Sequence, residues 1–379
     1  MHNSQISSRC VALFWSVSDM DLLKSLKVLH CRIGENVTRE FHLPPRLEQW
    51  KVWTDHDVKG LPPQLKKFCY VGPEDLNSSD HPMMDFYSST LQSLHLENCA
   101  YVVFICSKLT KPHVKNVKML DRCWSPNVSR LSDVGPGTLD LPGGFPSLAH
   151  LELSGWERQP LSNPQRLKSV SMKNSCVPQL SLVADHVSLE ITDLPPLAKI
   201  DADVVSLVRC RVPENVEISA TIIKGAKCDM ASVRGITCRE LECGAIDYIP
   251  TKMEKLTCHY QCSVRLKPVG KAAYELTQCE NLRYLYITGG VRHFLNGPET
   301  IKLPSTVRQF RLKDVGTSVQ RLHIETERRL EYFECTAAFK SRDQVTFTHE
   351  PAWSSIRCHS SFHPELMDNS KTVADEDSV

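Results

Sequence analysis

The chain has 379 residues, of which 41% are hydrophobic, and it carries 45 basic and 44 acidic side chains. This composition agrees with a folded, soluble protein of one elongated domain. The near-zero charge argues against a nucleic-acid-binding protein, which would show a basic excess or a segregated basic block.

The N-terminal residues 1–21 are predicted to form a cap. Their apolar run, Val11–Val17, is too short to span a bilayer and is soon followed by Asp19. A degenerate signal peptide is the alternative interpretation. We favour an amphipathic segment that covers the first coil of a repeat protein, because the apolar edge of a terminal coil would otherwise face water.

A short phrase returns along the chain: Leu or Ile, Pro, two variable residues, and an apolar residue that begins a strand-like stretch. It occurs at Leu43–Leu47, Leu61–Leu65, Ile249–Met253 and Leu303–Val307. Each copy continues with apolar residues at offsets of three and five. A recurring unit of this kind predicts a repeat architecture.

The same apolar triplet, with or without the proline, runs through most of the chain. Its clear copies start about 18 to 29 residues apart, which overlaps the roughly 20 to 29 residues of leucine-rich repeats. They are Leu26/Leu29/Cys31, Leu47/Trp50/Val52, Leu65/Phe68/Tyr70, Leu91/Leu94/Leu96, Val114/Val117/Met119, Leu148/Leu151/Leu153, Leu167/Val170/Met172, Val233/Ile236/Cys238, Met253/Leu256/Cys258, Leu282/Leu285/Ile287, Val307/Phe310/Leu312 and Leu330/Phe333/Cys335.

Weaker copies start at Leu197, Val205 and Val319 and fall out of phase. These copies are also compatible with apolar positions on the convex side of a repeat, rather than with strands of their own. In a strand, the residues at offsets three and five point inward and those at two, four and six point outward. Stacked coils therefore share one core, and the proline fits just before the strand because it lacks an N–H.

The stretch from Leu91 to Cys99, Leu-x-x-Leu-x-Leu-x-Asn-Cys, resembles the strand-plus-asparagine core of the leucine-rich-repeat superfamily. The resemblance covers roughly residues 22–340, although most copies lack the asparagine. It implies an α/β-type repeat solenoid: a leucine-rich-repeat horseshoe with a curved parallel β-sheet on its concave face and mostly irregular convex turns. The remaining segments are predicted as a C-terminal cap, 341–365, and a disordered acidic tail, 366–379.

The sixteen cysteines are scattered, and several occupy the inward position at offset five: Cys31, Cys210, Cys238, Cys258 and Cys335. Buried free thiols of this kind indicate a reduced environment, which predicts the cytoplasm or the nucleus. The alternative is a zinc site formed by Cys238, Cys243, Cys258 and Cys262, whose gaps are wider than those of zinc ribbons. We expect no metal and no cofactor.

No catalytic motif stands out in the sequence. A phosphate-binding glycine loop, a nucleophile elbow and a His-Glu-x-x-His pair are all missing. Cys258 and His259 are adjacent, so a strand would turn them to opposite faces. We therefore expect a protein that is not an enzyme.

Outward positions of the predicted strands carry aromatic and basic side chains, which are enriched at the energetic centres of protein interfaces. Strand propensity alone also explains some of these residues. The candidate contact residues are Lys51, Trp53, Lys67 and His95 toward the N-terminus, and Lys255, Tyr284, Tyr286, Arg311, Arg321, His323 and Tyr332 toward the C-terminus.

The sequence thus predicts a non-catalytic module that binds a protein or peptide on its concave strand face. The aromatic and basic character of this face would suit an acidic partner. One alternative is the substrate-recognition subunit of a cullin-type ubiquitin ligase, by resemblance to F-box repeat proteins, although no F-box helix set precedes Leu26. A zinc- or thiol-dependent enzyme is the second alternative. We expect neither nucleic acid nor a membrane as partner, and the oligomeric state is left open.

Overall fold

The computed structural model describes residues 26–358 except 34–42, 55, 74–81, 121–122, 135–144, 157–159, 164, 229, 231–232, 245–248, 260–275, 290–293, 296–298 and 316–318. The predicted N-terminal cap and acidic tail lie outside the described residues. The chain divides into two units. Unit 1 comprises Met1–Asp229 and Val233–Cys238, and unit 2 comprises Met230–Ser232 and Arg239–Val379.

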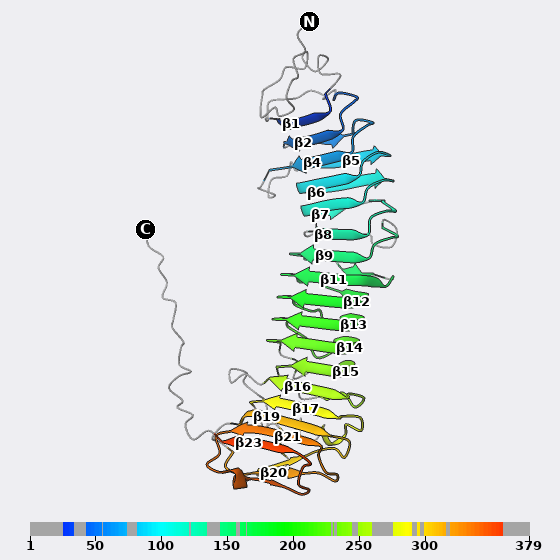
Figure 1. The fold of residues 1–379 in the computed structure, drawn as a ribbon. Coiled ribbons are helices and arrows are strands. Elements are labelled where there is room, and N and C mark those ends of the chain that lie inside the picture. Colours follow the sequence, from blue (N-terminus) through cyan, green and yellow to red (C-terminus); the bar gives the residue numbers. More distant parts are fainter. Residues whose placement is uncertain are drawn as a thin grey trace, which may run out of the picture. The chain divides into compact units, whose positions relative to one another are not determined.

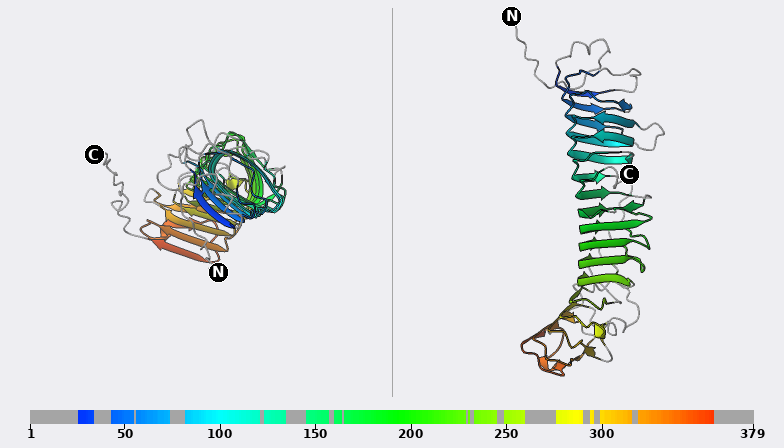
Figure 2. Two further views of the ribbon diagram at one scale, coloured as in Figure 1. Left: turned by 90° about the horizontal axis from the view of Figure 1, so that it is seen from above. Right: turned by 90° about the vertical axis from the view of Figure 1, so that its right-hand side faces the viewer.

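In unit 1 the strands lie one above another, from β1 to β14 (Figure 1). All of their pairings are parallel. Seen from above, their coils surround a shared interior (Figure 2). The strands are β1 (Val28–Arg32), β2 (Gln49–Trp53), β3 (Val58–Lys59), β4 (Lys67–Val71), β5 (Met83–Ser88), β6 (Ser93–Cys106), β7 (Lys111–Leu120), β8 (Arg130–Val134), β9 (His150–Ser154), β10 (Leu161–Ser162), β11 (Leu167–Lys173), β12 (Leu180–Glu190), β13 (Lys199–Val208) and β14 (Glu217–Ala226).

Unit 2 repeats this parallel stacking. The first half of β15 (Gly235–Cys243) belongs to unit 1 and its second half to unit 2. One ladder runs through β16 (Lys255–His259), β17 (Tyr284–Thr288), β19 (Gln309–Val315), β21 (Tyr332–Ala337) and β23 (Ser354–Cys358). A separate sheet contains β18 (Thr300–Lys302), β20 (Leu322–Glu325) and β22 (Val345–Phe347), with the 3-10 helix η3 (Arg342–Gln344) before β22. Parallel stacking thus continues past residue 340, and the boundaries of the C-terminal cap stay a prediction.

The prediction of an α/β horseshoe is wrong. The described residues are nearly all β, with 54% of them in strands, and they form a parallel β-solenoid of about 14 turns. Coil length explains the difference. Ser181, Lys199 and Glu217 are register partners, so these coils repeat every 18 residues. Since β12 has 11 residues and β13 has 10, too few residues remain for a convex helix, and helical conformation is confined to short turns in the described part of the chain.

The predicted alternation of inward and outward residues is confirmed. Trp50 and Val52 of β2, like Leu285 and Ile287 of β17, are at most 3% exposed. In unit 1 the inward aromatic rings form a column through Trp50, Phe68, Phe86, Phe104 and Phe145, with centroids of neighbours 5.0 to 6.1 Å apart. Removing this apolar surface from water is the main stabilising contribution to the coils.

The recurring proline has the role that the sequence suggests. Its carbonyl accepts a hydrogen bond from the backbone N–H three residues later, as in Leu47 N to Pro44 O and Val307 N to Pro304 O, both 3.1 Å. The same contact recurs at Pro62, Pro195, Pro213 and Pro250. A proline can begin such a turn because its fixed φ suits it and no N–H is needed there.

The out-of-phase apolar copies are strands rather than convex positions. The copies at Leu197 and Val205 fall largely within β13, which is long enough to hold both, and the copy at Val319 supplies β20. β12 shows why the phase slips. Asp185 and His186 are consecutive residues that both face away from the core, so the strand bends there and the alternation restarts.

Successive coils turn at residues with positive φ. Gly155, Asn174, Ile191 and Arg209 have φ between 48° and 63°. Each donates its backbone N–H to the strand end of the next coil, as in Ile191 N to Val208 O at 2.9 Å. Glycine and asparagine tolerate this conformation, but a β-branched residue such as Ile191 is strained in it.

We expect Ile191→Gly to leave the free energy of unfolding about 1 kcal/mol higher than Leu197→Gly does, because relief of the left-handed strain offsets the entropy that glycine adds to the unfolded chain. Ile191 is 46% exposed, so little apolar burial is lost. Urea denaturation of the purified variant checks this. Leu197→Gly is the control, since Leu197 is 73% exposed and has no positive φ. Equal destabilisation by both changes would contradict the strain at Ile191.

Candidate interaction surfaces

A column of large side chains lies on the outward face of the long ladder of unit 2. Register pairs Lys255 with Tyr284 and Tyr286 with Arg311, while Tyr332 is paired with Gln309. Parallel strands are about 4.8 Å apart, so these side chains stack along the direction of the coils. The structure thus brings together four predicted contact residues, Tyr284, Tyr286, Arg311 and Tyr332.

Arg311 is held at the centre of this column. Its guanidinium carbon lies 5.2 Å from the ring centre of Tyr286 and 4.9 Å from that of Tyr332, which are cation–π contacts. Its Nε is 3.4 Å from Glu334 Oε2, an ion pair without hydrogen-bond geometry. The Tyr332 hydroxyl donates to the same carboxylate at 3.0 Å. Loss of hydration and this hydrogen bond raise the pKa of Tyr332 above its usual value.

Trp353 extends the column, although it is not among the contact residues predicted from the sequence. Its ring stacks on Tyr332 with centroids 4.5 Å apart and planes within 11°. It precedes β23, whose Ser354 is the register partner of Phe333. Because Trp353 lies in the segment predicted as a C-terminal cap, its strand position was not recognised. It is 49% exposed, whereas Tyr286 and Tyr332 are half-buried. The C-terminal column is defined here as Tyr286, Arg311, Tyr332 and Trp353.

Four predicted contact residues of unit 2 are not members of this column, and one of them, Tyr284, lies beside it in register with Gln309. The sequence predicts Arg321 and His323 on the same face as Tyr286. However, His323 lies in β20 and Arg321 directly precedes it, and β20 belongs to the separate sheet with β18 and β22. There the His323 ring contacts Thr346 at 3.0 Å and Thr348 at 3.3 Å. Lys255 sits in the long ladder but pairs with Glu240 at 3.5 Å. The sequence could not separate these residues because it does not reveal which side of a coil a strand occupies.

The N-terminal group lies on outward positions of unit 1. Lys51 is 4.4 Å above the Trp53 ring. Lys51, Cys69, His95 and His113 are successive register partners from β2 to β7. The His95 and His113 rings stack with centroids 4.5 Å apart. Burial and the neighbouring His113 lower the pKa of His95. Lys67 is exposed on β4, two residues before Cys69, which is the β4 member of this row.

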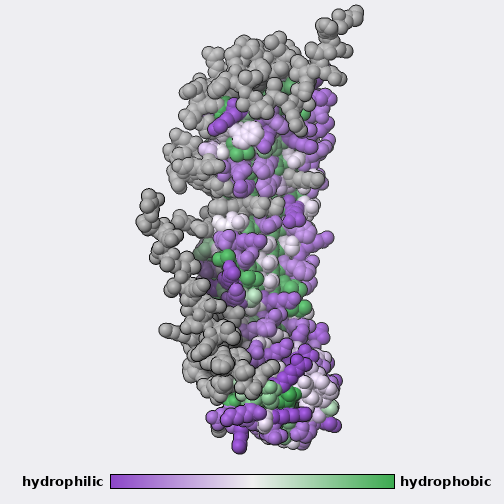
Figure 3. Space-filling view, turned by 60° about the vertical axis from the view of Figure 1, so that its left-hand side comes forward, coloured by the Kyte–Doolittle hydropathy of each residue, from purple (hydrophilic) through white to green (hydrophobic). Residues whose placement is uncertain are grey.

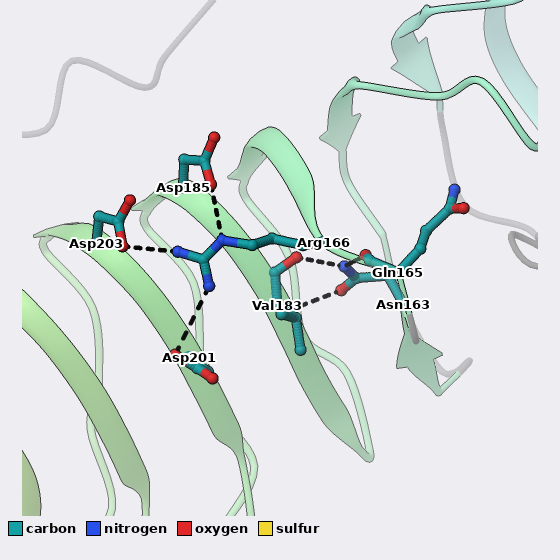
Figure 4. Close-up of polar contacts among 7 residues, drawn as sticks. All are labelled: Asn163, Gln165, Arg166, Val183, Asp185, Asp201 and Asp203. Carbon is teal, nitrogen blue, oxygen red and sulfur yellow. Dashed lines mark hydrogen bonds and ion pairs between the residues drawn. The ribbon is translucent and has the colours of Figure 1, made fainter.

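Charged side chains on other outward positions are mostly paired between coils. Arg166 points at three carboxylates of β12 and β13, with 2.7 Å to Asp185, 2.7 Å to Asp203 and 4.0 Å to Asp201 (Figure 4). Beside it, the Asn163 amide accepts from Val183 N and donates to Val183 O, which ties adjacent coils together (Figure 4). Hydrophilic side chains cover much of the face in Figure 3, in agreement with this pairing.

The structure describes three of the four cysteines of the alternative zinc site, Cys238, Cys243 and Cys258. Cys243 and Cys258 are buried register partners whose sulfur atoms are 4.0 Å apart. Cys238 is buried as well, and Cys262 lies outside the described residues. Among the residues that the structure describes, no group of three or more His, Cys, Asp or Glu could hold a metal ion. Burial raises the pKa of the Cys99, Cys106 and Cys335 thiols to about 12, so these are unreactive at neutral pH.

Comparison with known proteins identifies no family for this chain. No protein-family model matches this chain, and no curated protein or solved structure matches it. Within the described residues, none of the helical segments has the length and apolarity needed to cross a membrane. The function therefore has to be argued from the surfaces themselves.

Proposed function

We propose that the protein is a non-catalytic interaction module that binds another protein or peptide through the C-terminal column on the outward face of β17, β19, β21 and β23. The supporting observation is the stack of Tyr286, Arg311, Tyr332 and Trp353. Tyrosine, tryptophan and arginine are the residue types that most often dominate binding energies at protein interfaces.

The stack favours binding because it is already ordered. Arg311 is fixed by two rings and by Glu334, so little side-chain entropy would be lost on association. Trp353 offers an open aromatic surface at the end of the column. A partner that covers Trp353 and Tyr286 would remove apolar area from water without having to order these side chains.

The buried thiols favour the cytoplasm or the nucleus as the compartment. Cys243 and Cys258, like most of the described cysteines, are buried in the core as small apolar residues, which is typical of thiols in a reducing compartment. A relation to leucine-rich-repeat proteins remains a hypothesis that rests on the motif from Leu91 to Cys99. Within it, Asn98 donates its side-chain amide to the carbonyl of Gly72 at 3.3 Å.

The test is to identify a partner and then measure its affinity. A photo-crosslinking amino acid at position 353 captures the partner, which mass spectrometry identifies, and titration calorimetry follows with the purified pair. We expect Tyr286→Ala with Arg311→Ala to weaken binding by about 2 kcal/mol or more, roughly 30-fold. The thermal melting curve reports whether the double variant folds.

The matched control is Tyr87→Ala with Trp124→Ala, which removes two exposed aromatic residues from unit 1. It should leave the affinity unchanged. An unaltered affinity in the Tyr286/Arg311 variant, with normal folding, would reject the column as the binding surface. Capture of a cullin-linker complex that depends on residues 1–25 would support the ligase-adaptor alternative instead.

A further inference from the structure

Opposite charges meet on neighbouring coils in most of the solenoid. Lys173 pairs with Glu190 at 3.6 Å and Lys199 with Glu217 at 3.0 Å in unit 1. Arg308 pairs with Glu331 at 3.2 Å in unit 2. Such pairs avoid the like-charge repulsion that parallel, in-register stacking would otherwise produce. A group of basic side chains outside this pattern therefore needs another explanation.

The first coils of unit 1 contain such a group. Arg32 of β1, Lys51 of β2 and Lys67 of β4 have no ion pair with a carboxylate of any described residue. Lys27 and Lys66 share one carboxylate, Glu48, at 3.1 and 2.8 Å. Among the described residues of these three coils, basic side chains thus outnumber acidic ones, although the whole chain is close to neutral. We call Lys27, Arg32, Lys51, Lys66 and Lys67 the basic face.

We propose that the basic face binds an extended acidic peptide segment of a partner protein. Charge complementarity is the argument for the occupant. Arg32, Lys51 and Lys67 lie in three adjacent strands spaced about 4.8 Å apart, and Lys27 and Lys66 directly precede two of these strands. Alternate residues of an extended peptide repeat about every 6.6 Å, so several carboxylates can meet cations at once. Trp53, 36% exposed, adds apolar surface beside them.

The chemistry of the face favours carboxylates over nucleic acid. Single-stranded nucleic acids bind on open aromatic rings, but Lys51 already lies 4.4 Å above the Trp53 ring. This proposal names a partner chemistry for a surface in unit 1 and does not depend on the C-terminal column of unit 2.

The test uses the full-length protein and a fluorescent ten-residue oligoglutamate peptide, with binding followed by fluorescence anisotropy. We expect binding that weakens as salt rises from 50 to 300 mM, because added ions screen the charges. Lys51→Glu with Lys67→Glu should weaken it by about tenfold or more. Lys168→Glu with Lys224→Glu is the matched control, since it changes the net charge equally at exposed positions of β11 and β14 and should cost less than twofold.

Three results would overturn the proposal. The first is no binding of oligoglutamate by the unmodified protein. The second is equal weakening by the two double variants, which would mean that only net charge matters. The third is tighter binding of a ten-nucleotide oligothymidylate than of oligoglutamate, which would assign the face to nucleic acid. None of these results bears on the Tyr286/Arg311 experiment, so the two proposals fail separately.

Discussion

Replacing Phe86 by alanine is expected to lower the free energy of unfolding of unit 1 by about 3 to 5 kcal/mol. Phe86 is fully buried and stands in the middle of the aromatic column, 5.9 Å from Phe68 and 6.1 Å from Phe104. The coils above and below are tied by backbone hydrogen bonds, so they cannot close the resulting cavity. Urea denaturation followed by far-UV circular dichroism measures the loss.

Tyr87→Ala is the control for this experiment. Tyr87 follows Phe86 in β5 but points outward and is 66% exposed. Its replacement should change stability by less than about 0.5 kcal/mol. Similar losses for both variants would mean that β5 does not alternate between core and solvent as described.

Deleting one whole coil, residues 199–216, is expected to leave a folded solenoid. Lys199 and Glu217 are register partners, so the deletion places β14 directly after the turn at Pro195, in the position that β13 held. The inward residues Ile218 and Ile223 then take the places of Ile200 and Val205. Because each coil contacts only its neighbours, the remaining stack keeps its core.

The control deletion removes one residue fewer, 199–215. It shifts β14 by one position, which turns Ile218 and Ile223 toward water and polar residues toward the core. We expect this variant to lose its cooperative thermal transition and to aggregate, while the 18-residue deletion keeps a β-type circular dichroism spectrum. A folded 17-residue deletion, or an unfolded 18-residue one, would contradict the coil repeat.

Much of the core could be predicted because inward residues recur at fixed offsets. The triplets at Leu65/Phe68/Tyr70 and Val307/Phe310/Leu312 are buried as expected. The helix-bearing horseshoe could not be excluded from the sequence, because the apolar spacing is the same for a strand of either solenoid. Only the register, with 18 residues from Lys199 to Glu217, shows that the coils are too short for convex helices.

The candidate surface was predictable to a similar extent. Tyr286 and Arg311 occupy outward positions of clear copies, so the sequence identified them. Trp353 was missed because its segment was assigned to the C-terminal cap, although Trp353, Ile356 and Cys358 keep the spacing of the apolar triplet. Arg321 and His323 were grouped with the wrong strands because β20 has the same apolar alternation as the strands of the long ladder.

The sequence by itself determined that apolar residues repeat with strand periodicity, that a proline turn precedes many of the strands, and that the repeats stack in parallel. These properties follow from local spacing and backbone chemistry. Only the tertiary structure decided which strands share a sheet, which charges are neutralised across coils, and which rings meet Arg311. Those contacts join residues about 18 to 29 positions apart, and they depend on the length of each coil, which local periodicity does not encode.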